Sequence, residues 1–265
     1  MTEPMTSFPR EQSALGLVFA FLGGLLLLFI VAPIAGIYWD SMGGSMAEAI
    51  RSEEVRDSIW LSLWVSMAGT LLFSLLAVPL AYLLARRSFP LKGIVNGIID
   101  IPIIIPHSAA GIAVLGVITR ESLAGRAANA VGLKFVGGPA GIMVAMAFVS
   151  IPFLINAARD GFAAVPERLE KIALTLGASP ARMFFTVSLP LAWRSVLSGL
   201  ILMWARGMSE FGAVVIVAYN PKTAPVLIYE RFTSFGLKYS TPVAALFVTV
   251  CLMIFVGLRI VKRKV

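Results

Sequence analysis

The amino-acid sequence predicts an all-α membrane protein with six transmembrane helices. Of its 265 residues, 58% are hydrophobic and only 14% are charged, and the mean hydropathy is +0.90. Soluble domains are close to half apolar and about a quarter charged, so this composition excludes an ordinary soluble domain. Six runs with few or no charges are each long enough to cross a bilayer. No stretch has the composition of a soluble domain, which predicts a single membrane domain over residues 1–265.

The six apolar runs are taken in chain order. The first run is far longer than the apolar core of a secretory signal, so we expect a retained helix. In the second run, Pro79 predicts a kink. The third run is interrupted by Asp100, Pro102, Pro106 and His107, and two prolines so close together predict a broken helix. The expected spans cover residues 14–39, 58–85, 93–119, 139–158, 195–219 and 241–258.

The distribution of basic residues predicts the orientation of the chain. An even number of spans places both termini on one side of the membrane. The face formed by residues 1–13, 86–92, 159–194 and 259–265 carries thirteen Lys and Arg, whereas residues 40–57, 120–138 and 220–240 carry eight. Cytoplasmic loops carry the excess of Lys and Arg, so we expect a multi-pass protein of the cell membrane with both termini in the cytoplasm. The net charge of +8 then reflects topology and not a nucleic-acid partner.

A charged segment between the fourth and fifth spans, residues 164–190, differs from the rest of the chain. Pro166 predicts the first residue of a short helix, and Gly177 predicts its end. Ser179 and Pro180 are typical of the N-cap and first residue of a second helix. Such an amphipathic helix suits either a groove on a soluble partner or the membrane surface. Its apolar stripe consists of Leu169, Ile172, Ala173 and Leu176.

The spacing at the end of this segment resembles a family motif. Gly177, nine residues, Val187, one residue and Leu189-Pro190 match the pattern G-x9-I-x-L-P, with Val in place of Ile. That pattern marks the cytoplasmic coupling loop of permease subunits in binding-protein-dependent ABC importers. The family's loop begins with Glu-Ala-Ala, where this chain has Lys171-Ile172-Ala173, so only Ala173 matches. Glu170 stands one residue earlier, and after a helix rotation of roughly 100° it would take the place of the family's glutamate in a salt bridge.

A narrower resemblance covers nearly the whole chain. It is to the permeases of molybdate and tungstate importers, and sulfate permeases, which share the SEFGA-type signal, are the nearest competitors. The segments that carry this resemblance are AYLLARRSFPLKG at 81–93, IPIIIPHSAAGIA at 101–113, RLEKIALTLGASPARMFFTVSLPL at 168–191, WARGMSEFGAV at 204–214 and APVLIYERF at 224–232.

These resemblances imply a type I ABC importer permease fold and a role in transport, not catalysis. Two copies of the chain would form a pore through which a tetrahedral oxyanion, molybdate or tungstate, enters the cytoplasm by alternating access. Two ATP-binding cassette subunits would carry ATP and magnesium, and an extracytoplasmic binding protein would deliver the anion. The chain has no G-x-x-x-x-G-K-[ST] motif, in agreement with ATP hydrolysis on a separate subunit. We expect no cofactor and no metal in this chain.

Three alternatives stay open at this point. A sulfate or thiosulfate permease would differ in the anion that its binding protein selects. An ion-driven secondary transporter or channel would work without an ATPase, and it would leave the charged loop unexplained. A membrane anchor for a signalling complex would bind partners without transport.

The loop at about 159–194 supplies the residues that would couple the permease to the ATPase. The alternative for its charged side chains is a solvated face. Gly177 is expected to adopt a positive φ, as the turn between two short helices. The coupling residues implied by the resemblance are Glu167, Arg168, Glu170, Lys171, Ala173, Gly177, Arg182, Leu189 and Pro190.

Polar residues inside the spans form a second group. Arg206 and Glu210 are four residues apart, so they are predicted to share a helix face and to pair. They would line or gate the pore or only hold helices together, and Glu210 would largely cancel the field of Arg206, which argues against direct anion binding. Asp100 and His107 would share a face only if their helix were continuous, and structural hydrogen bonding is favoured for them over a proton relay or metal site. Helix packing is likewise favoured for Asn156. The pore or gate candidates are Arg206, Ser209, Glu210, Asp100, His107 and Asn156.

Overall fold

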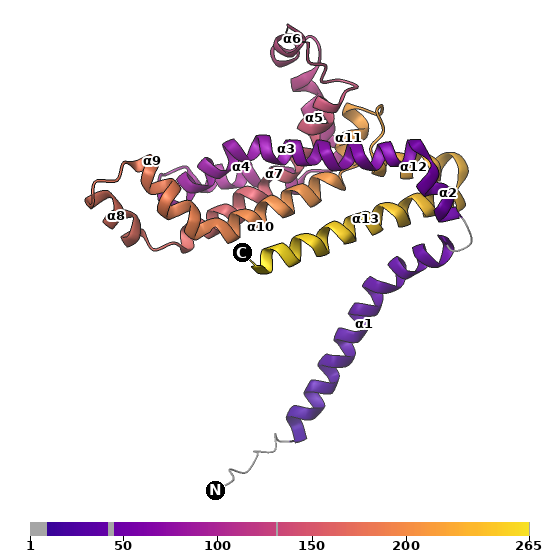
Figure 1. Ribbon diagram of the computed structural model, residues 1–265, viewed down its shortest axis with the longest axis horizontal. Helices are drawn as coiled ribbons and strands as arrows, with labels where there is room; N and C mark the ends of the chain where they lie inside the picture. The colour runs from indigo at the N-terminus through magenta and orange to yellow at the C-terminus, as the bar shows by residue number, and fades with distance from the viewer. Residues whose placement is uncertain (1–9, 42–44, 131, 265) are drawn as a thin grey trace.

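The computed structural model describes residues 10–41, 45–130 and 132–264, and the regular secondary structure in these ranges is all helical (Figure 1). Residues 1–9, which the charge count assigns to the basic face, lie outside the described residues. The long helices are α1 (Arg10–Ser41), α3 (Glu53–Arg86), α7 (Pro139–Ala164), α10 (Leu189–Met208) and α13 (Leu237–Lys264). The shorter elements are α2 (Ser45–Arg51), α4 (Lys92–Ile104), α5 (His107–Ile118), α6 (Leu123–Ala130), α8 (Glu167–Thr175), α9 (Pro180–Met183), the π-helical turn η1 (Phe184–Ser188), α11 (Gly212–Val217) and α12 (Ala224–Phe235).

Within the described ranges, five helical segments are long and apolar enough to cross a membrane, and the pair α4–α5 gives a sixth if it counts as one span. The third run is broken, as its prolines predict: α4 and α5 are bent by 113°, and Ile105, before Pro106, has an extended backbone. The prediction of a continuous fifth span is wrong. Helix α10 ends at Met208, and the short helix α11 begins only at Gly212.

Helices α3, α7 and α10 form the centre of the bundle, with α7 packed along both of the others. One end of the bundle carries α8 and α9, on the left of Figure 1, and is here called the loop end. The opposite end carries α2 and α12. Leu84, Phe162 and Met203 belong to the core cluster nearer the loop end, and Ile142 and Val214 belong to the second cluster. A third cluster, which includes Ile59, Leu227 and Phe247, joins α3, α12 and α13, so packed apolar clusters hold the bundle along its length.

Helix α5 approaches α11 closely because of one glycine. A Cβ atom added at Gly111 would lie 2.9 Å from both the Cα and the carbonyl oxygen of Ala213. Membrane helices gain little from hiding apolar surface from lipid, so such close backbone contacts between small residues hold them together. The contact places the start of α5 beside the start of α11, where the polar residues described below meet.

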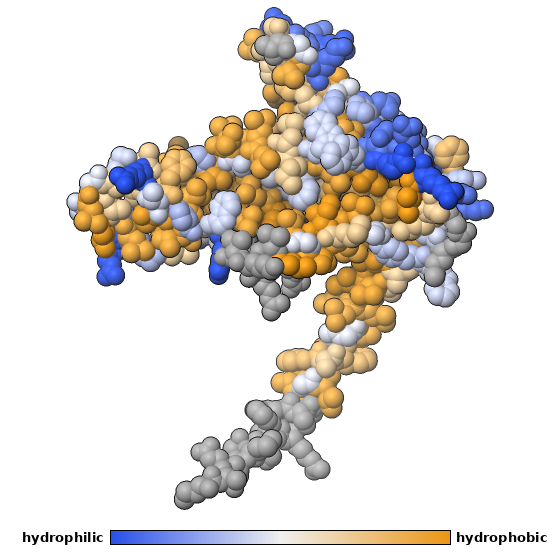
Figure 2. Space-filling model, in the orientation of Figure 1, coloured by the Kyte–Doolittle hydropathy of each residue, from blue (hydrophilic) through white to orange (hydrophobic). Residues whose placement is uncertain are grey.

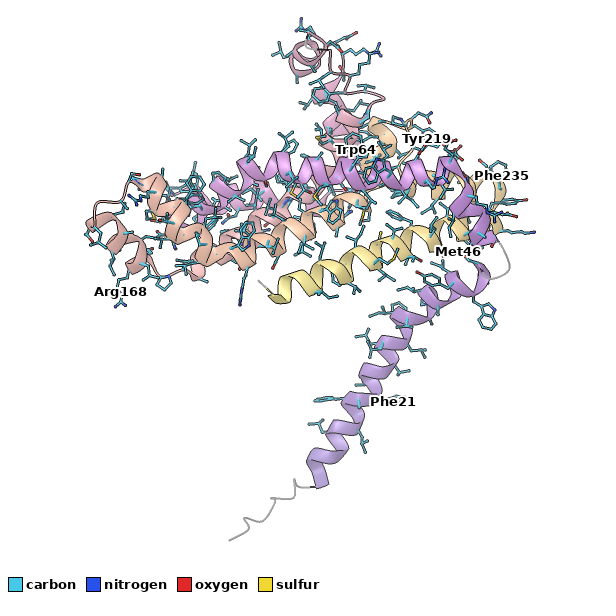
Figure 3. The ribbon with its side chains drawn as sticks, in the orientation of Figure 1. Phe21, Met46, Trp64, Arg168, Tyr219 and Phe235 are labelled. Atoms are coloured by element: carbon cyan, nitrogen blue, oxygen red, sulfur yellow. The ribbon has the colours of Figure 1, made fainter. Side chains whose placement is uncertain are left out.

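Helix α1 stands apart from the bundle (Figure 1). Phe21, labelled in Figure 3, is 67% exposed and Phe29 is 76% exposed. Only its C-terminal part touches the bundle, on α13, where the Tyr38 hydroxyl and Thr249 Oγ1 are 2.8 Å apart. Figure 2 shows apolar surface along the described length of α1 and much of the bundle, with hydrophilic residues gathered towards the ends and on α6. A helix this apolar on all sides requires lipid or another chain around it.

The close contact at Gly111 gives a first test. We expect Gly111→Val to lower the thermal unfolding temperature of the detergent-purified protein, because overpacking at a backbone contact costs about 1–3 kcal/mol. Gly116→Val on the same helix is the control, because a Cβ at Gly116 meets no atom within 4 Å. Equal melting of the two variants would contradict the packing described for α5 and α11.

Candidate functional site

The charged segment at the loop end folds as the two short helices that its sequence predicts. Gly177 has φ +88°, as expected for the turn, and its N–H and that of Ala178 bond to the last carbonyls of α8. The hydroxyl of Ser179 accepts a hydrogen bond from the backbone N–H of Arg182 at 3.2 Å, which caps α9. Pro166 differs slightly from its predicted place, because its extended backbone makes it the N-cap of α8 instead of its first helical residue.

A buried carboxylate ties α8 to the end of α3. Glu170 is only 7% exposed and receives hydrogen bonds from Arg86 Nε at 3.0 Å and Arg86 Nη2 at 2.8 Å. The hydroxyl of Ser188 donates to the same carboxylate at 2.7 Å, and the hydroxyl of Tyr82 lies 3.4 Å away. Arg86 Nη2 also donates to the carbonyl of Val165 at 2.9 Å. We call Tyr82, Arg86, Glu170 and Ser188 the Glu170 cluster.

The position of Glu170 agrees with one expectation and corrects another. It forms a salt bridge, as expected of a residue that replaces the family's glutamate, but it points into the bundle towards Arg86 and not outwards with the other charged coupling candidates. Burial alone would raise the pKa of Glu170, but hydrogen bonds from Arg86 and Ser188 and the positive charge of Arg86 outweigh it and hold the pKa below the ordinary 4.5. The pair is therefore ionised at neutral pH. Its contribution to stability is present above 4.5 and is lost as the pH falls through the lowered pKa.

Another face of α8 is exposed and apolar. Leu169 and Ile172 are 37% and 45% exposed, and Leu176, the residue after the helix, reaches 82%. Glu167 and Lys171 form an exposed ion pair at 3.3 Å, and Arg168 extends away from the bundle in Figure 3. The apolar stripe that the spacing predicts thus exists, but much of its surface has no protein over it. This arrangement presents a rigid, partly apolar surface to whatever lies beyond the loop end.

The remaining coupling candidates differ in exposure. Arg182 on α9 is exposed, and Ala173 is half-buried within α8. Leu189 and Pro190 belong to the first turn of α10, with Leu189 packed against the core cluster near the loop end and Pro190 exposed. These two residues therefore fix where the loop rejoins the bundle.

A second polar cluster forms where two helices are interrupted. The carboxylate of Glu210 lies 2.6 Å from His107 Nδ1 and 3.0 Å from Arg206 Nη2, and it accepts the backbone N–H of Ala213 at 2.9 Å. Arg206 Nη2 lies 2.9 Å from both ring nitrogens of His107. We call His107, Arg206 and Glu210 the Arg206 cluster. The predicted pairing of Arg206 with Glu210 is confirmed, but Glu210 lies beyond the end of α10, where its bond to Ala213 supports the start of α11.

The break between α4 and α5 separates Asp100 from His107, so the shared face that a continuous helix would give them does not form. Asp100 Oδ1 instead accepts a hydrogen bond from Asn156 Nδ2 at 2.8 Å, which joins α4 to α7. This contact agrees with the helix-packing role favoured for Asn156. Ser209 is exposed beside the Arg206 cluster, and its hydroxyl bonds to the carbonyl of Arg206. Among the described residues, no group of three or more His, Cys, Asp or Glu side chains could hold a metal ion.

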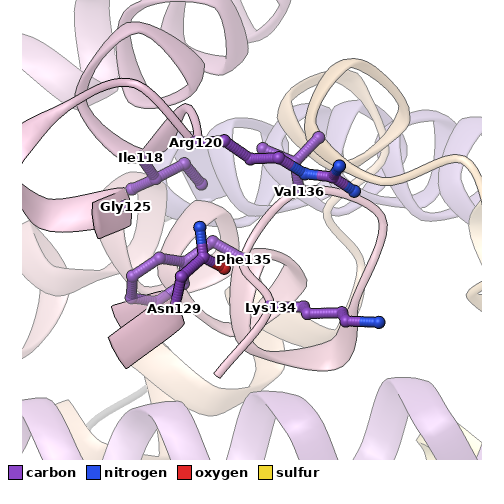
Figure 4. Close-up of a pocket in the computed structure, with 7 residues that line it drawn as sticks. All are labelled: Ile118, Arg120, Gly125, Asn129, Lys134, Phe135 and Val136. Carbon is purple, nitrogen blue, oxygen red and sulfur yellow. The ribbon is translucent and has the colours of Figure 1, made fainter. Parts of the chain in front are cut away.

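The region around α6 contains a small recess. It lies between the end of α5, α6 and the segment before α7, and Arg120, Asn129 and Lys134 are among its lining residues (Figure 4). Its cavity of about 10 Å³ holds no more than one water molecule. The recess is therefore too small to be a binding site for a substrate.

Sequence reasoning missed Arg86 as a partner of α8. Arg86 and Arg87 follow an apolar run, so they are typical of the charged end of a span, and nothing in their local sequence points to a residue 84 positions away. Sequence reasoning also missed His107 as a partner of Glu210, because the bend that brings them together is tertiary. The one available signal was that a buried carboxylate needs a cation.

Comparisons with known proteins agree on one family. The family model described as "Binding-protein-dependent transport system inner membrane component" matches residues 77–265. The "Molybdate/tungstate transport system permease protein WtpB" of Thermococcus kodakarensis is 45% identical over 250 residues, which cover 93% of this chain and 96% of that protein. The protein of the same name in Methanocaldococcus jannaschii is 40% identical and covers 90% and 93%. The "Sulfate transport system permease protein CysT" of Synechocystis is 27% identical over 90% of this chain and 86% of that protein.

Solved structures with low sequence identity share the fold. A crystal structure of a bacterial ABC transporter that imports the acidic polysaccharide alginate has a chain with a TM-score of 0.74 at 15% identity, covering 97% of this chain and 98% of that one. An inward-facing MetNI methionine ABC transporter has a TM-score of 0.64 at 18% identity, covering 80% and 98%. The helical arrangement is therefore that of ABC importer permeases.

The Glu170 cluster gives the second test. We expect Arg86→Gln to release α8 from the bundle, because removing one partner of a buried ion pair costs about 3–5 kcal/mol. The measurement is limited trypsin digestion of the purified protein, with faster cleavage expected after Arg168 and Lys171. Glu167→Gln is the matched control, because it breaks only the exposed pair with Lys171, worth about 0.5 kcal/mol. Unchanged digestion of Arg86→Gln would show that the cluster does not hold the loop.

Proposed function

Because this chain belongs to the family of binding-protein-dependent transport system inner membrane components, we propose that it is the membrane-spanning permease of an ATP-driven importer for molybdate or tungstate. The observation that carries this proposal is the 45% identity with a molybdate/tungstate permease over 93% of the chain. Identity with a sulfate permease falls to 27% over a similar length, which favours the former anions over sulfate. The transported solute is then a tetrahedral dianion that must cross a bilayer without being exposed to lipid.

The loop end faces the cytoplasm in this proposal. The excess of Lys and Arg on the face that includes residues 159–194 supports this orientation. The opposite end, with α2 and α12, then faces outwards, towards an extracytoplasmic binding protein. A neighbour in fold is an alginate transporter solved in complex with its substrate-bound periplasmic protein, which supports a partner of the same kind here.

The exposed face of α8 would dock into a cleft on the ATPase, which binds ATP and magnesium. An amphipathic helix that presents several exposed apolar side chains has the form of a groove-binding helix. The Glu170 cluster would hold that helix against α3, so a displacement of α8 by the ATPase would be passed to the bundle as a rigid-body movement. In this proposal the coupling contacts include Ile172, Leu176 and Arg168, whereas Glu170 acts by positioning α8.

A second copy of this chain would complete the pore, with two ATPase subunits below the pair. The support comes from α1, whose described side chains between Leu15 and Ser41 contribute almost no buried surface to this copy. An apolar helix that reaches away from its own bundle is suited to lie along a neighbouring one. The proposed complex therefore contains two permeases, two ATPases and one binding protein.

Transport is tested with the permease and the ATPase encoded beside it, reconstituted together in proteoliposomes with the cognate binding protein. We expect uptake of radiolabelled molybdate that requires ATP and magnesium on the ATPase side and is blocked by excess tungstate. Excess sulfate is expected to compete at least about tenfold less well, a difference of about 1.4 kcal/mol in binding.

Two results would contradict the proposal. Uptake by liposomes that hold this chain alone would indicate an ion-driven secondary transporter. Equal competition by sulfate would indicate a sulfate permease.

The docking face of α8 is tested by a pair of leucines with nearly equal exposure, Leu176 at 82% and Leu123 on α6 at 81%. We expect Leu176→Glu to reduce co-purification of the ATPase and molybdate uptake by roughly tenfold or more, because a charge is then buried in the interface. Leu123→Glu, on the opposite side of the membrane, is expected to change neither. If both variants keep the ATPase bound, α8 is not its docking site.

A further inference from the structure

We infer that Arg206, held in place by Glu210 and His107, forms an oxyanion-binding site within the bundle, at which molybdate or tungstate pauses on its way through the permease. This inference rests on the proposed function and assigns a site inside the membrane chain to the anion. Such a site needs free hydrogen-bond donors on its open side and neighbouring groups that hold these donors in place. It must also lie at a position in the bilayer that the anion passes during transport.

The buried carboxylate and the exposed donors point in different directions. Glu210 is 1% exposed, whereas the side chains of Arg206 and His107 are 27% and 36% exposed. The negative charge is therefore covered by the two basic side chains, and an approaching ligand meets the guanidinium and the imidazole first. The spacing in the sequence suggests that Glu210 cancels the field of Arg206, but the folded arrangement leaves the donors outermost and the carboxylate behind them.

Arg206 keeps hydrogen-bonding capacity for a ligand. Its side-chain contacts within the described part of the chain, to His107 and Glu210, all use Nη2. The other two guanidinium nitrogens, Nε and Nη1, have no partner among the described residues and carry three of the five N–H donors. A planar guanidinium with free N–H groups matches the oxygen geometry of a tetrahedral oxyanion better than any other side chain.

The cluster is rigidly supported. Glu210 is fixed by the backbone N–H of Ala213, and His107 is the first residue of α5. A Cβ at Gly212 would lie 2.7 Å from His107 Cβ, so the start of α11 is packed directly against the imidazole-bearing residue. An anion would therefore meet donors that are already in place, and little binding energy is spent on ordering them.

The depth of Arg206 places the cluster near the outer boundary of the bilayer. Arg206 is seventeen residues beyond the start of α10 at the loop end, about 25 Å along a helix that rises 1.5 Å per residue. The hydrocarbon core is about 30 Å thick. A partly exposed arginine at this depth reaches polar surroundings, so its open side faces the headgroup region, the second copy or a hydrated path. An anion released from the outer face would reach this position early.

The test uses the reconstituted complex with tungstate as the probe. Wild-type complex is measured first for ATP-driven tungstate uptake, so that a failure of the proposed function is seen before any variant is made. We expect Arg206→Gln to raise the tungstate concentration for half-maximal uptake by roughly tenfold or more, since a hydrogen bond to a charged group is lost. Arg206→Lys is expected to restore part of the loss. Arg231→Gln is the matched control, an arginine of similar exposure that pairs with Glu54 elsewhere.

Glu210→Gln separates a ligand site from a purely structural pair. The amide keeps one acceptor oxygen, for either Arg206 or Ala213, and carries no negative charge that offsets the guanidinium, so tungstate affinity is expected to stay equal or to increase. If Arg206→Gln lowers only the maximal rate or the thermal stability, with half-saturation unchanged, the pair only holds helices and the inference fails. It also fails if Glu210→Gln weakens tungstate binding as much as Arg206→Gln does.

Discussion

The buried ion pair between Arg86 and Glu170 determines how the loop end relates to the rest of the molecule. A charged helix of nine residues has too few contacts of its own to keep a fixed position. It keeps one because its single inward carboxylate is bound by an arginine at the end of α3 and by a serine at the end of η1. Three segments distant in sequence are thus joined at one point. The apolar residues of α8 can remain exposed because the helix is anchored by another face.

Polar side chains inside the bundle are also placed where hydrogen-bonding groups need partners. In a continuous helix the backbone N–H and C=O groups bond to one another, so a polar side chain there bonds mainly to a neighbouring helix. Where α4 and α10 end within the membrane region, backbone groups become free, and the side chains that serve them gather at those points. Glu210 illustrates this, because one oxygen supports the start of α11 while the other holds Arg206 and His107. The two interruptions create a setting where a cation, Arg206, is partly exposed and supported from behind by a buried acid.

Local features of the fold could be predicted from sequence, and long-range ones could not. The positive φ of Gly177 and the cap at Ser179 depend on residues within a few positions, and the break before Pro106 depends on proline chemistry. The end of α10 at Met208 was missed because a further apolar run follows Ser209 and Glu210, so the hydropathy of residues 195–219 as a whole hides the turn. A salt bridge of Glu170 was expected, but its partner Arg86 was missed, because it lies 84 positions away and the neighbouring Arg87 is an equal candidate in the sequence. The pairing of Arg206 with Glu210 could be predicted, because four residues span about one helical turn. The third member of that cluster, His107, could not, because it comes from another helix.

The isolation of α1 has a consequence for how the protein is made. Of the spans described, α1 comes first in the chain, so it enters the bilayer before the helix on which its C-terminal part rests has been synthesised. It is stable there without a protein partner because all of its sides are apolar and can be solvated by lipid. A helix with one polar stripe would be unstable alone in lipid, and it would need its partner at the moment of insertion. The absence of such a stripe therefore lets synthesis and assembly proceed as separate events.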